Sequence, residues 1–535
     1  MSLAGEVAGF KHPKSKLVNG LTCINLPQRK REQRLQSRRG EFWVGEPKLP
    51  DHDKSNHLSY FRLDPERNLM GAARSSNLRR RLAVNRSKRS LAILAGVCAA
   101  LAGAATEAHA VASFARQTGL PCSSCHTTVP ELTPLGRLFK LNGYTFTGVP
   151  QITQKGGGTK AGLDITSWLP LSAFLQFSYS ATHKPQPGTQ NGNFEFPQAA
   201  SLFLAGSMAS HAGGFVQVTY DAQADHFSWD NTDIRYANRT KAAGKELIWG
   251  VTLNNNPTLE DLWNSTPAWG FPFVSTDVAP SPTAATLIDG GLAQDVAGLG
   301  GYAMFDAHLY GAFTIYRSEH IGAPQPNPGT GSPINIQGVA PYWRVAWQQG
   351  RGNNYLAVGT YGMHVSSTPQ AVVGLKDTFT DVAADLQYER VFPWEARNDL
   401  LTIHSTYIHE SSDLNGTANL TPPGATPGPH RLNTLRADAI YHFGNKYSAT
   451  IGFFGTTGTT DNVLYAPADI TGSASGDPRS KGYIANFSWW PVQNILLGVQ
   501  YTGYWSFNGT GTNYDAAGRN ASDNNSIYTV VWLIF

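Results

Sequence analysis

Two cysteines and a histidine have the types and the spacing for a defined piece of chemistry. They form the run Cys122-Ser123-Ser124-Cys125-His126. Two thiols three residues apart can form thioether bonds to the two vinyl groups of one porphyrin, and the adjacent imidazole then lies under the iron. A zinc site would need further ligands, and a redox Cys-x-x-Cys would need a βαβ setting. The motif therefore predicts one covalent haem c, with His126 as the axial iron ligand.

Residues 70–110 have the form of a secretory signal peptide. A basic region is followed by an apolar run at 91–105, which is too short to span a membrane, and by Ala108-His109-Ala110. A buried core helix is the alternative, but the basic flank and the small residues favour export with cleavage after Ala110. Cys23 and Cys98 lie upstream of that cut, so the exported chain keeps only the two cysteines of the motif.

Residues 1–69 are polar and lack periodicity, and we expect a non-native or disordered extension, with translation starting at Met70. Residues 1–110 hold 20 Lys and Arg against nine Asp and Glu, whereas residues 111–535 hold 22 against 29. The basic character thus belongs to the segment that we expect to be removed. No nucleic-acid partner is therefore expected.

The rest of the chain has the pattern of membrane-spanning strands. Only 15% of all residues are charged, against about 25% in ordinary soluble domains. No run reaches the roughly 18 consecutive apolar residues of a spanning helix. Instead, segments of alternating apolar and polar residues follow one another between turn residues. We predict sixteen strands, at about 167–182, 195–209, 214–222, 227–240, 246–256, 293–303, 307–319, 336–348, 353–366, 377–391, 398–411, 431–443, 446–459, 480–490, 494–507 and 524–535.

The connections between these segments give an independent test. Short and mostly longer links alternate, as they do between the periplasmic turns and external loops of outer-membrane barrels, although the link 223–226 is short where a long one is expected. The chain also ends on an alternating strand and Phe535, which resembles the signal read by the outer-membrane insertion machinery. The alternative is a soluble β-sandwich or propeller. We predict an all-β protein, an outer-membrane antiparallel barrel over 161–535, with a monohaem cytochrome c segment over 111–160 that plugs or abuts the lumen.

A segment this small cannot bury a haem alone, so we expect the barrel to complete the pocket. Between residue 111 and about residue 150 there is no Met, and no His besides His126, so the sixth iron ligand must be distant or water. Candidates on predicted lumen faces or strand ends are His308, His442, Met208, Met304 and His404. Basic residues near the motif, which could pair with haem propionates or simply be solvated, are Arg116, Arg137 and Lys140.

The region around the motif resembles the outer-membrane cytochrome–porin fusions. The resemblance rests on Phe114-Ala115-Arg116-Gln117-Thr118-Gly119, on Cys122 to His126, and on Leu132-Thr133-Pro134, Gly136-Arg137, Phe139-Lys140 and Gly143-Tyr144. Members of that family pair one haem with a barrel of about sixteen strands, and the best-known members oxidise extracellular ferrous iron. Ala112 departs from the Pro expected in iron-oxidising members. The resemblance implies an iron(II):cytochrome oxidoreductase in the bacterial outer membrane, which is embedded in the lipid bilayer.

On this interpretation electrons pass from an extracellular donor, Fe(II), through one haem to a soluble periplasmic cytochrome. Glu260 and Asp261 are candidates for attracting Fe(II), because hard oxygen ligands suit that ion, although surface acids are common. Two other functions remain open. The first is a diffusion porin whose haem is a sensor or regulator, and the second is a haem peroxidase or gas-binding protein with an open sixth position.

Overall fold

The computed structural model describes residues 112–146, 153–154, 165–166, 169–186, 190–222, 225–266, 279–318, 335–395 and 397–535. The predicted extension at 1–69 and the predicted signal peptide at 70–110 lie outside these residues. Among the helices of the described residues, none is long and apolar enough to cross a membrane.

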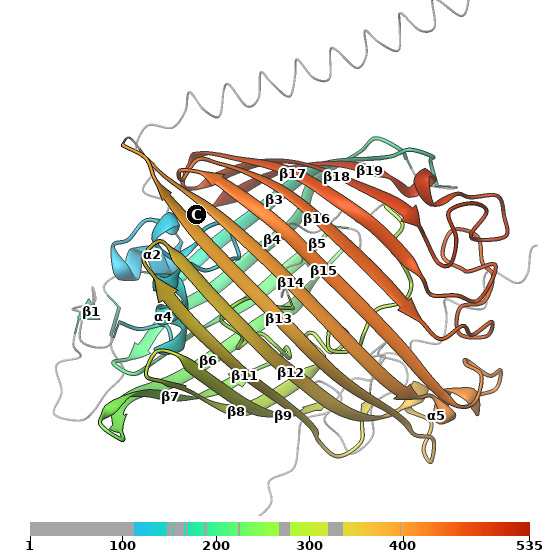
Figure 1. Ribbon diagram of the computed structural model, residues 1–535, viewed down its shortest axis with the longest axis horizontal. Helices are drawn as coiled ribbons and strands as arrows, with labels where there is room; N and C mark the ends of the chain where they lie inside the picture. The colour runs from blue at the N-terminus through green and yellow to red at the C-terminus, as the bar shows by residue number, and fades with distance from the viewer. Residues whose placement is uncertain are drawn as a thin grey trace, which may run out of the picture. The chain divides into compact units, whose positions relative to one another are not determined.

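Sixteen antiparallel strands of the described chain close into a barrel (Figure 1). They are β3 (Leu171–Thr182), β4 (Asn193–Ala209), β5 (Ala212–Asp221), β6 (His226–Ala242), β7 (Lys245–Asn254), β8 (Val296–Phe305), β9 (Leu309–Ser318), β11 (Ala340–Arg351), β12 (Asn354–Thr368), β13 (Asp377–Pro393), β14 (Asn398–Asp413), β15 (Pro429–Phe443), β16 (Tyr447–Gly458), β17 (Ser480–Val492), β18 (Ile495–Ser506) and β19 (Ser526–Ile534). Each strand pairs with its neighbours in sequence, and β19 pairs with β3 to close the ring.

Shorter elements complete the described chain. The two-residue strand β10 (Asn335–Ile336) pairs with β12, and β1 (Thr153–Gln154) pairs with β2 (Ile165–Thr166). The helices are α2 (Ser113–Thr118), α3 (Cys122–Cys125), α4 (Pro134–Leu141), α5 (Asn415–Ala418), η2 (Pro369–Ala371) and η3 (Ala521–Asn524).

The predicted fold is confirmed, and each of the sixteen predicted segments coincides with one strand. Local alternation explains this agreement, since successive side chains of a strand point to opposite faces. On β15, for example, Leu435 is half exposed on the outer face whereas Asp438 and His442 are buried on the inner face. Short turns gather at one end of the barrel, where the chain also ends, and we call it the short-turn end (Figure 1).

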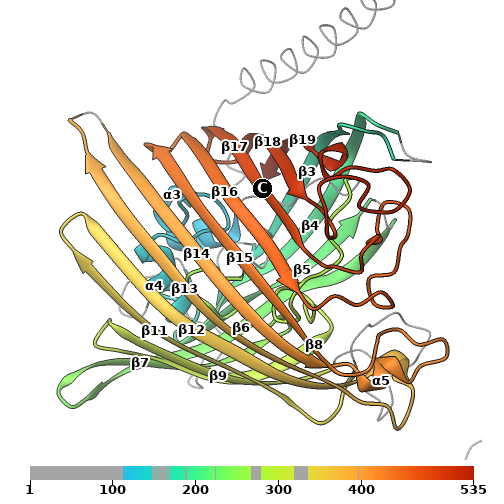
Figure 2. The ribbon, with the colours of Figure 1, turned by 45° about the vertical axis from the view of Figure 1, so that its right-hand side comes forward.

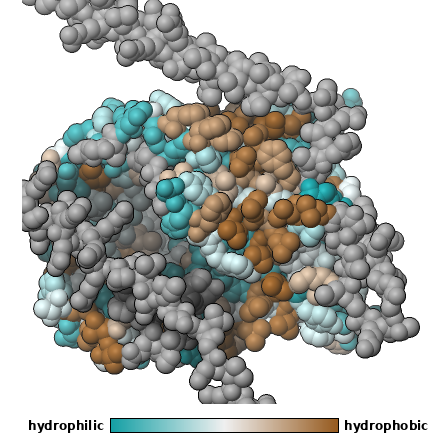
Figure 3. Space-filling model, turned by 180° about the vertical axis from the view of Figure 1, so that it is seen from behind, coloured by the Kyte–Doolittle hydropathy of each residue, from teal (hydrophilic) through white to brown (hydrophobic). Residues whose placement is uncertain are grey.

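The outer wall carries large apolar side chains. A broad hydrophobic area covers the strands in the view from behind (Figure 3). Exposed apolar residues on the strands include Leu202, Leu204, Val251, Leu253, Leu299, Phe313, Ile315, Val345, Trp347, Val382, Leu435, Ile451, Phe453, Phe487, Val499 and Ile527. The inner wall is polar, with buried Gln, Asn, Asp, Glu and Arg side chains. Such an inside-out distribution suits a barrel whose outer face meets lipid rather than water.

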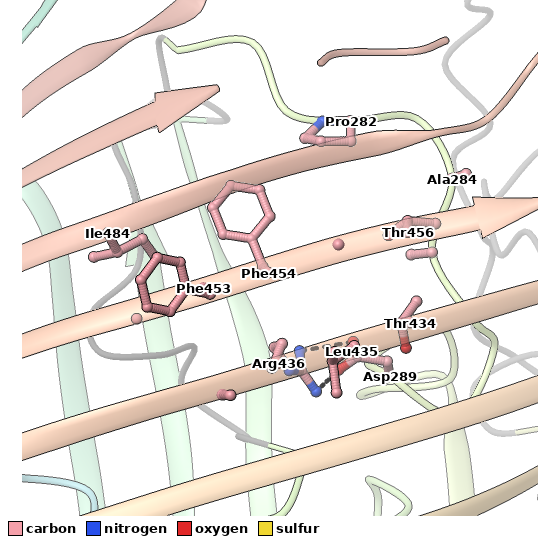
Figure 4. A pocket seen from close by; sticks show the side chains of 14 residues that line it. Pro282, Ala284, Asp289, Thr434, Leu435, Arg436, Phe453, Phe454, Thr456 and Ile484 are labelled. Carbon is pink, nitrogen blue, oxygen red and sulfur yellow. Dashed lines mark hydrogen bonds and ion pairs between the residues drawn. The ribbon is translucent and has the colours of Figure 1, made fainter. Parts of the chain in front are cut away.

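The loop between β7 and β8 folds back into the lumen. The carboxylate of Asp289 accepts two hydrogen bonds from Arg436 of β15, at 2.7 and 3.0 Å. Asp381 and Glu410 of the wall each accept a backbone N–H from this loop at 2.7 Å. A cavity of about 240 Å³ remains between the loop and strands β15 and β16, beside the Arg436–Asp289 pair (Figure 4). Buried polar contacts therefore fix the loop across part of the lumen.

Residues 112–146 also lie inside the lumen, near the short-turn end (Figure 2). We call residues 112–146 the plug. It contacts inner-wall residues all around the ring: Ser113 Oγ donates to the carbonyl of Ala205 on β4 at 2.6 Å, Tyr302 on β8 donates to the carbonyl of Leu141 at 2.9 Å, and Arg137 meets Glu389 on β13. A segment that touches strands this far apart around the ring must lie within it.

Aromatic side chains of the plug form a cluster that packs against the barrel wall. Phe114 stacks on Tyr144 with ring centroids 5.3 Å apart, and Phe139 packs edge-on against both rings. Phe215 of β5 extends this cluster into the wall. The Tyr144 hydroxyl donates to Asp233 at 2.5 Å, so a buried carboxylate fixes the end of the plug.

The plug can pack against β5 only because residue 213 is a glycine. A Cβ atom there would meet the carbonyl oxygen of Gly143 at 2.7 Å and that of Gly206 at 2.9 Å, and both are backbone atoms that cannot turn aside. The plug backbone therefore lies directly against this strand.

We predict that Gly213→Ala displaces the end of the plug, at a cost of about 1–3 kcal/mol for the overlap. Trypsin should then cleave after Lys140 faster in the folded barrel. Gly311→Ala on β9 is the matched control, since a Cβ there meets nothing within 4 Å. Equal cleavage rates in the two variants would contradict the prediction.

Candidate functional site

The Cys-x-x-Cys-His run begins with one helical turn, which carries the two cysteine thiols. Helix α3 runs from Cys122 to Cys125, and the backbone N–H of His126 donates to the Cys122 carbonyl at 2.9 Å. Residues three apart in a helix lie on the same face, so both thiols face one way. Both cysteines are free and partly buried. This geometry is what thioether bonds to the two edges of one porphyrin require.

The acidity of the thiols argues against a redox dithiol. Burial raises the pKa of Cys122, and burial together with the neighbouring Cys122 raises the pKa of Cys125 to about 11. Reactive Cys-x-x-Cys motifs instead have a lowered pKa, because the thiolate is the nucleophile. The turn thus supplies two protonated thiols rather than an active thiolate.

His126 has the state expected of an axial ligand. Burial lowers its pKa, so the ring is neutral near pH 7. Its Nδ1 atom is buried and has no hydrogen-bond partner among the described residues. A neutral imidazole is the form that binds iron. The two thiols and this histidine therefore fit a covalently bound haem.

Helix α4 holds the motif in place. The backbone N–H of Thr133 donates to the Cys125 carbonyl at 3.0 Å, and the Thr133 hydroxyl donates to the Ser124 carbonyl at 2.6 Å. Thr133 also caps the helix, accepting the N–H of Gly136 at 3.1 Å. A Cβ atom at Gly136 would come within 2.2 Å of the Cys125 carbonyl oxygen, so α4 packs against α3 only because this residue is glycine.

The three basic residues near the motif are bound to the barrel or to the loop. The Arg116 guanidinium donates to the carbonyls of Leu169 and Leu171, and Lys140 donates to the carbonyls of Leu259 and Asp261 at 2.5 and 2.9 Å. Burial lowers the pKa of Lys140 to about 8. Their role as propionate partners stays a prediction, but they already fasten the plug.

Arg137 forms a buried ion pair with the barrel wall. It lies 2.7 Å from Glu389 of β13, with both side chains buried, and its guanidinium lies 4.4 Å from the centre of the Tyr355 ring. It also donates to the carbonyl of Leu132 at 2.8 Å. One cation thus joins the plug's own backbone to the wall.

The structure separates the five candidates for a distal iron ligand. Met208 is 38% exposed and lies in the outward-facing row beside Leu204, so its assignment to the lumen was wrong. His308 lies exposed in the turn between β8 and β9, where its ring contacts the carbonyl of Gln348 at 3.0 Å, and it too is outside the lumen. Met304 is buried in the same hydrophobic cluster as Leu141 of the plug.

His404 and His442 both lie on the inner face of the barrel wall, and His404 contacts the loop that follows the motif. His404 is on β14, and its Nδ1 atom is 3.5 Å from Glu131 Oε1 of the plug and 3.2 Å from Asp438 Oδ1 of β15. His442 is 4% exposed, and its Nε2 atom has no partner within the described part of the chain. Sequence reasoning did not single out Glu131, which follows His126 by five residues.

Glu131 is itself an unusual carboxyl group. It is 7% exposed, and burial raises its pKa to about 7. Its Oε2 atom has no hydrogen-bond partner among the residues that the structure describes. The neighbouring His404 compensates only part of the cost of burying this group.

Glu260 and Asp261 lie buried at the base of the inward-folded loop rather than on a surface. Glu260 is fully buried, and its carboxylate accepts hydrogen bonds from Thr314 at 2.9 Å and Tyr316 at 3.2 Å. Burial raises the pKa of Glu260. Burial acts the same way on Asp261, but Arg344, 3.2 Å away, holds its pKa below the usual value. Their role in attracting Fe(II) stays a prediction, while their contacts anchor the loop.

We predict that Arg137→Met destabilises the docked plug by about 3–5 kcal/mol, because it leaves Glu389 buried without a counter-charge. Hydrogen–deuterium exchange of the amides in residues 112–146 is the measurement. The double variant Arg137→Met/Glu389→Leu removes both charges and should recover much of the loss. An exchange rate in the single variant equal to that of the unchanged protein would refute the prediction.

Comparisons with known proteins find similar solved structures but no related sequence. No family model matches it, and no curated protein matches its sequence. Similar solved structures include the outer membrane channel DcaP of Acinetobacter baumannii (12% identity, 71% of this chain and 100% of that chain, TM-score 0.39) and the anion-selective porin from Comamonas acidovorans (10%, 68% and 98%, 0.39). Outer-membrane expressed OmpT of Vibrio cholerae is a third (11%, 71% and 99%, 0.36). At these identities the likeness concerns the fold alone.

Proposed function

We propose that the protein is an outer-membrane electron conduit, which takes electrons from an extracellular donor, Fe(II), through one covalent haem c to a periplasmic cytochrome. One observation carries this proposal: the Cys122 to His126 turn is held inside a closed barrel by buried contacts on several sides. A redox group inside a barrel lies between the two sides of the membrane, and a group outside it would not.

The outer wall supports the membrane location. In lipid every backbone polar group must be paired within the protein, and a closed barrel meets that demand. The apolar outer rows of the strands match a hydrocarbon environment. Phe535 ends the chain beside Ala173, with which it exchanges two backbone hydrogen bonds, and we propose that the insertion machinery reads this end.

The position of the plug supports a direction for the electron. In outer-membrane barrels short turns face the periplasm, so the short-turn end that holds the plug is the periplasmic one. The hydrocarbon core is about 30 Å thick. A redox centre set into the lumen from this side shortens the distance to external donors while staying accessible to a soluble periplasmic acceptor.

The chain's own residues do the binding and positioning. Cys122 and Cys125 would hold the haem covalently and His126 would bind its iron, and the group would supply one-electron redox chemistry. His442, with an unpartnered buried Nε2, is our choice for a further iron ligand, and His404 is the second choice. Arg137, Lys140 and Tyr144 fix the plug against the wall, so the site is rigid.

The first experiment tests attachment. In a host with a cytochrome c maturation system, the full chain should retain haem after denaturation in detergent, with the mass of one haem added. Cys122→Ala/Cys125→Ala should abolish this, whereas Ser123→Ala, in the same turn, should not. A folded barrel without covalent haem, in cells that mature other c-type cytochromes, would refute the proposal.

The second experiment tests the donor. Stopped-flow mixing of intact cells with Fe(II) should reduce the haem, and cells carrying the double cysteine variant should show no such change. A haem that no external donor reduces, together with an open pore in planar bilayers, would favour a diffusion porin with a sensor. A five-coordinate high-spin spectrum would favour the gas-binding or peroxidase function instead.

His442→Ala should convert a low-spin spectrum to a high-spin one.

A further inference from the structure

Three side chains from three separate segments meet at the boundary between plug and wall. Glu131 comes from the plug, His404 from β14 and Asp438 from β15, and His404 and Asp438 are directly paired in the strand register. One ligand-type atom from each residue lies within 4.8 Å of the other two. Glu131 and Asp438 are buried, and His404 is largely so.

The separations around His404 are long for hydrogen bonds and suit a shared ion. The Nδ1 atom of His404 makes a hydrogen bond to Asp438 Oδ1 at 3.2 Å and lies 3.5 Å from Glu131 Oε1. Charge-assisted N–H···O bonds are usually about 2.7–2.9 Å long. Two ligands that each lie about 2.1 Å from one zinc-sized ion, at a tetrahedral angle, are about 3.4 Å apart.

The side chains near His404 carry more negative than positive charge, which favours binding of a cation. Three carboxylates surround His404: Glu131, Asp438 and Glu389. Arg137 pairs with Glu389, and Arg436 is engaged by Asp289 of the loop. Glu131 and Asp438 therefore share His404 alone as a direct ion-pair partner within the described residues.

A second observation points to a missing ligand. The Oε2 atom of Glu131 is buried and has no partner among the described residues, although its Oε1 atom faces His404. An unpaired buried carboxylate oxygen is costly, and coordination to an ion relieves that cost.

We propose that Glu131, His404 and Asp438 form a binding site for one divalent first-row transition-metal ion. One imidazole nitrogen and two carboxylate oxygens suit such ions, and a water molecule completes the coordination. The ion joins the plug to two neighbouring strands and so fastens the loop that follows His126. This site assigns His404 to the ion and leaves His442 as the further ligand of the haem iron, and it does not depend on the proposed electron transfer.

The test uses the untagged full chain with its haem, stripped by a chelator and then titrated with Zn²⁺. Elemental analysis should give one zinc per chain in addition to the haem iron. His404→Gln, Asp438→Asn and Glu131→Gln should each weaken Zn²⁺ binding by at least about tenfold. His409→Gln is the matched control, because it lies on the outward-facing row of the same strand. Heat-modifiable migration in gels verifies that each variant is folded.

X-ray absorption at the zinc edge gives a second measurement on the unchanged protein. It should show nitrogen and oxygen ligands with the scattering of one imidazole. Equal affinity in His404→Gln and His409→Gln, or no stoichiometric zinc in the unchanged protein, would overturn the inference. The haem content measured on the same samples keeps the two proposals apart. Zinc without haem refutes only the conduit, and haem without zinc refutes only the metal site.

Discussion

Backbone hydrogen bonding around a closed ring is the constraint on which the rest of the structure depends. A strand with a free edge cannot lie in lipid, so β3 must meet β19, although they are the first and last strands of the barrel. Closure also creates an inside, and that inside is lined by Asp, Glu, Arg and Tyr side chains. The polar lumen can hold a charged plug and an inward loop, whereas an apolar lumen would give their charges no partners.

Buried ion pairs then determine how the lumen is filled. Arg137, Arg344 and Arg436 each join an inner-wall strand to the plug or to the inward loop. Removing one partner of such a pair would destabilise the structure, because the other charge would stay buried without compensation. The plug and the loop are therefore positioned by specific charge matches and not by hydrophobic packing alone. This matching holds the Cys122 to His126 turn at one place and in one orientation.

The sequence predicted whatever depends on local alternation. The sixteen strands and the inner faces of β14 and β15 follow from period-two patterns and turn lengths. Met208 was placed wrongly because it was chosen for its position near a strand end, whereas the alternation that exposes Leu202 and Leu204 also puts Met208 on the outer face. His308 lies just beyond the end of β8, where a small error in strand length decides whether a side chain enters the lumen.

Contacts between distant segments could not be predicted. Glu131 lies beside His404 and Asp438, which follow it by more than 270 residues in the sequence. No local sequence pattern predicts that these residues come together. Likewise, the sequence places Glu260 and Asp261 in a loop, where acidic residues are usually exposed. They contact the barrel wall because this loop folds into the lumen. The haem attachment predicted for the Cys-x-x-Cys-His run needs no such contact, because that prediction rests on five consecutive residues.

The β3–β19 seam has a consequence for biogenesis. Residues 526–534 follow every other strand of the barrel in the sequence, yet they pair with residues 174–182, so the ring closes only after all the intervening strands are made. Arg116 of α2 bonds to carbonyls at the start of β3, beside the place where Phe535 joins Ala173. The plug thus contacts the strand with which the last strand of the barrel must pair, so docking of the plug and closure of the ring take place at the same seam.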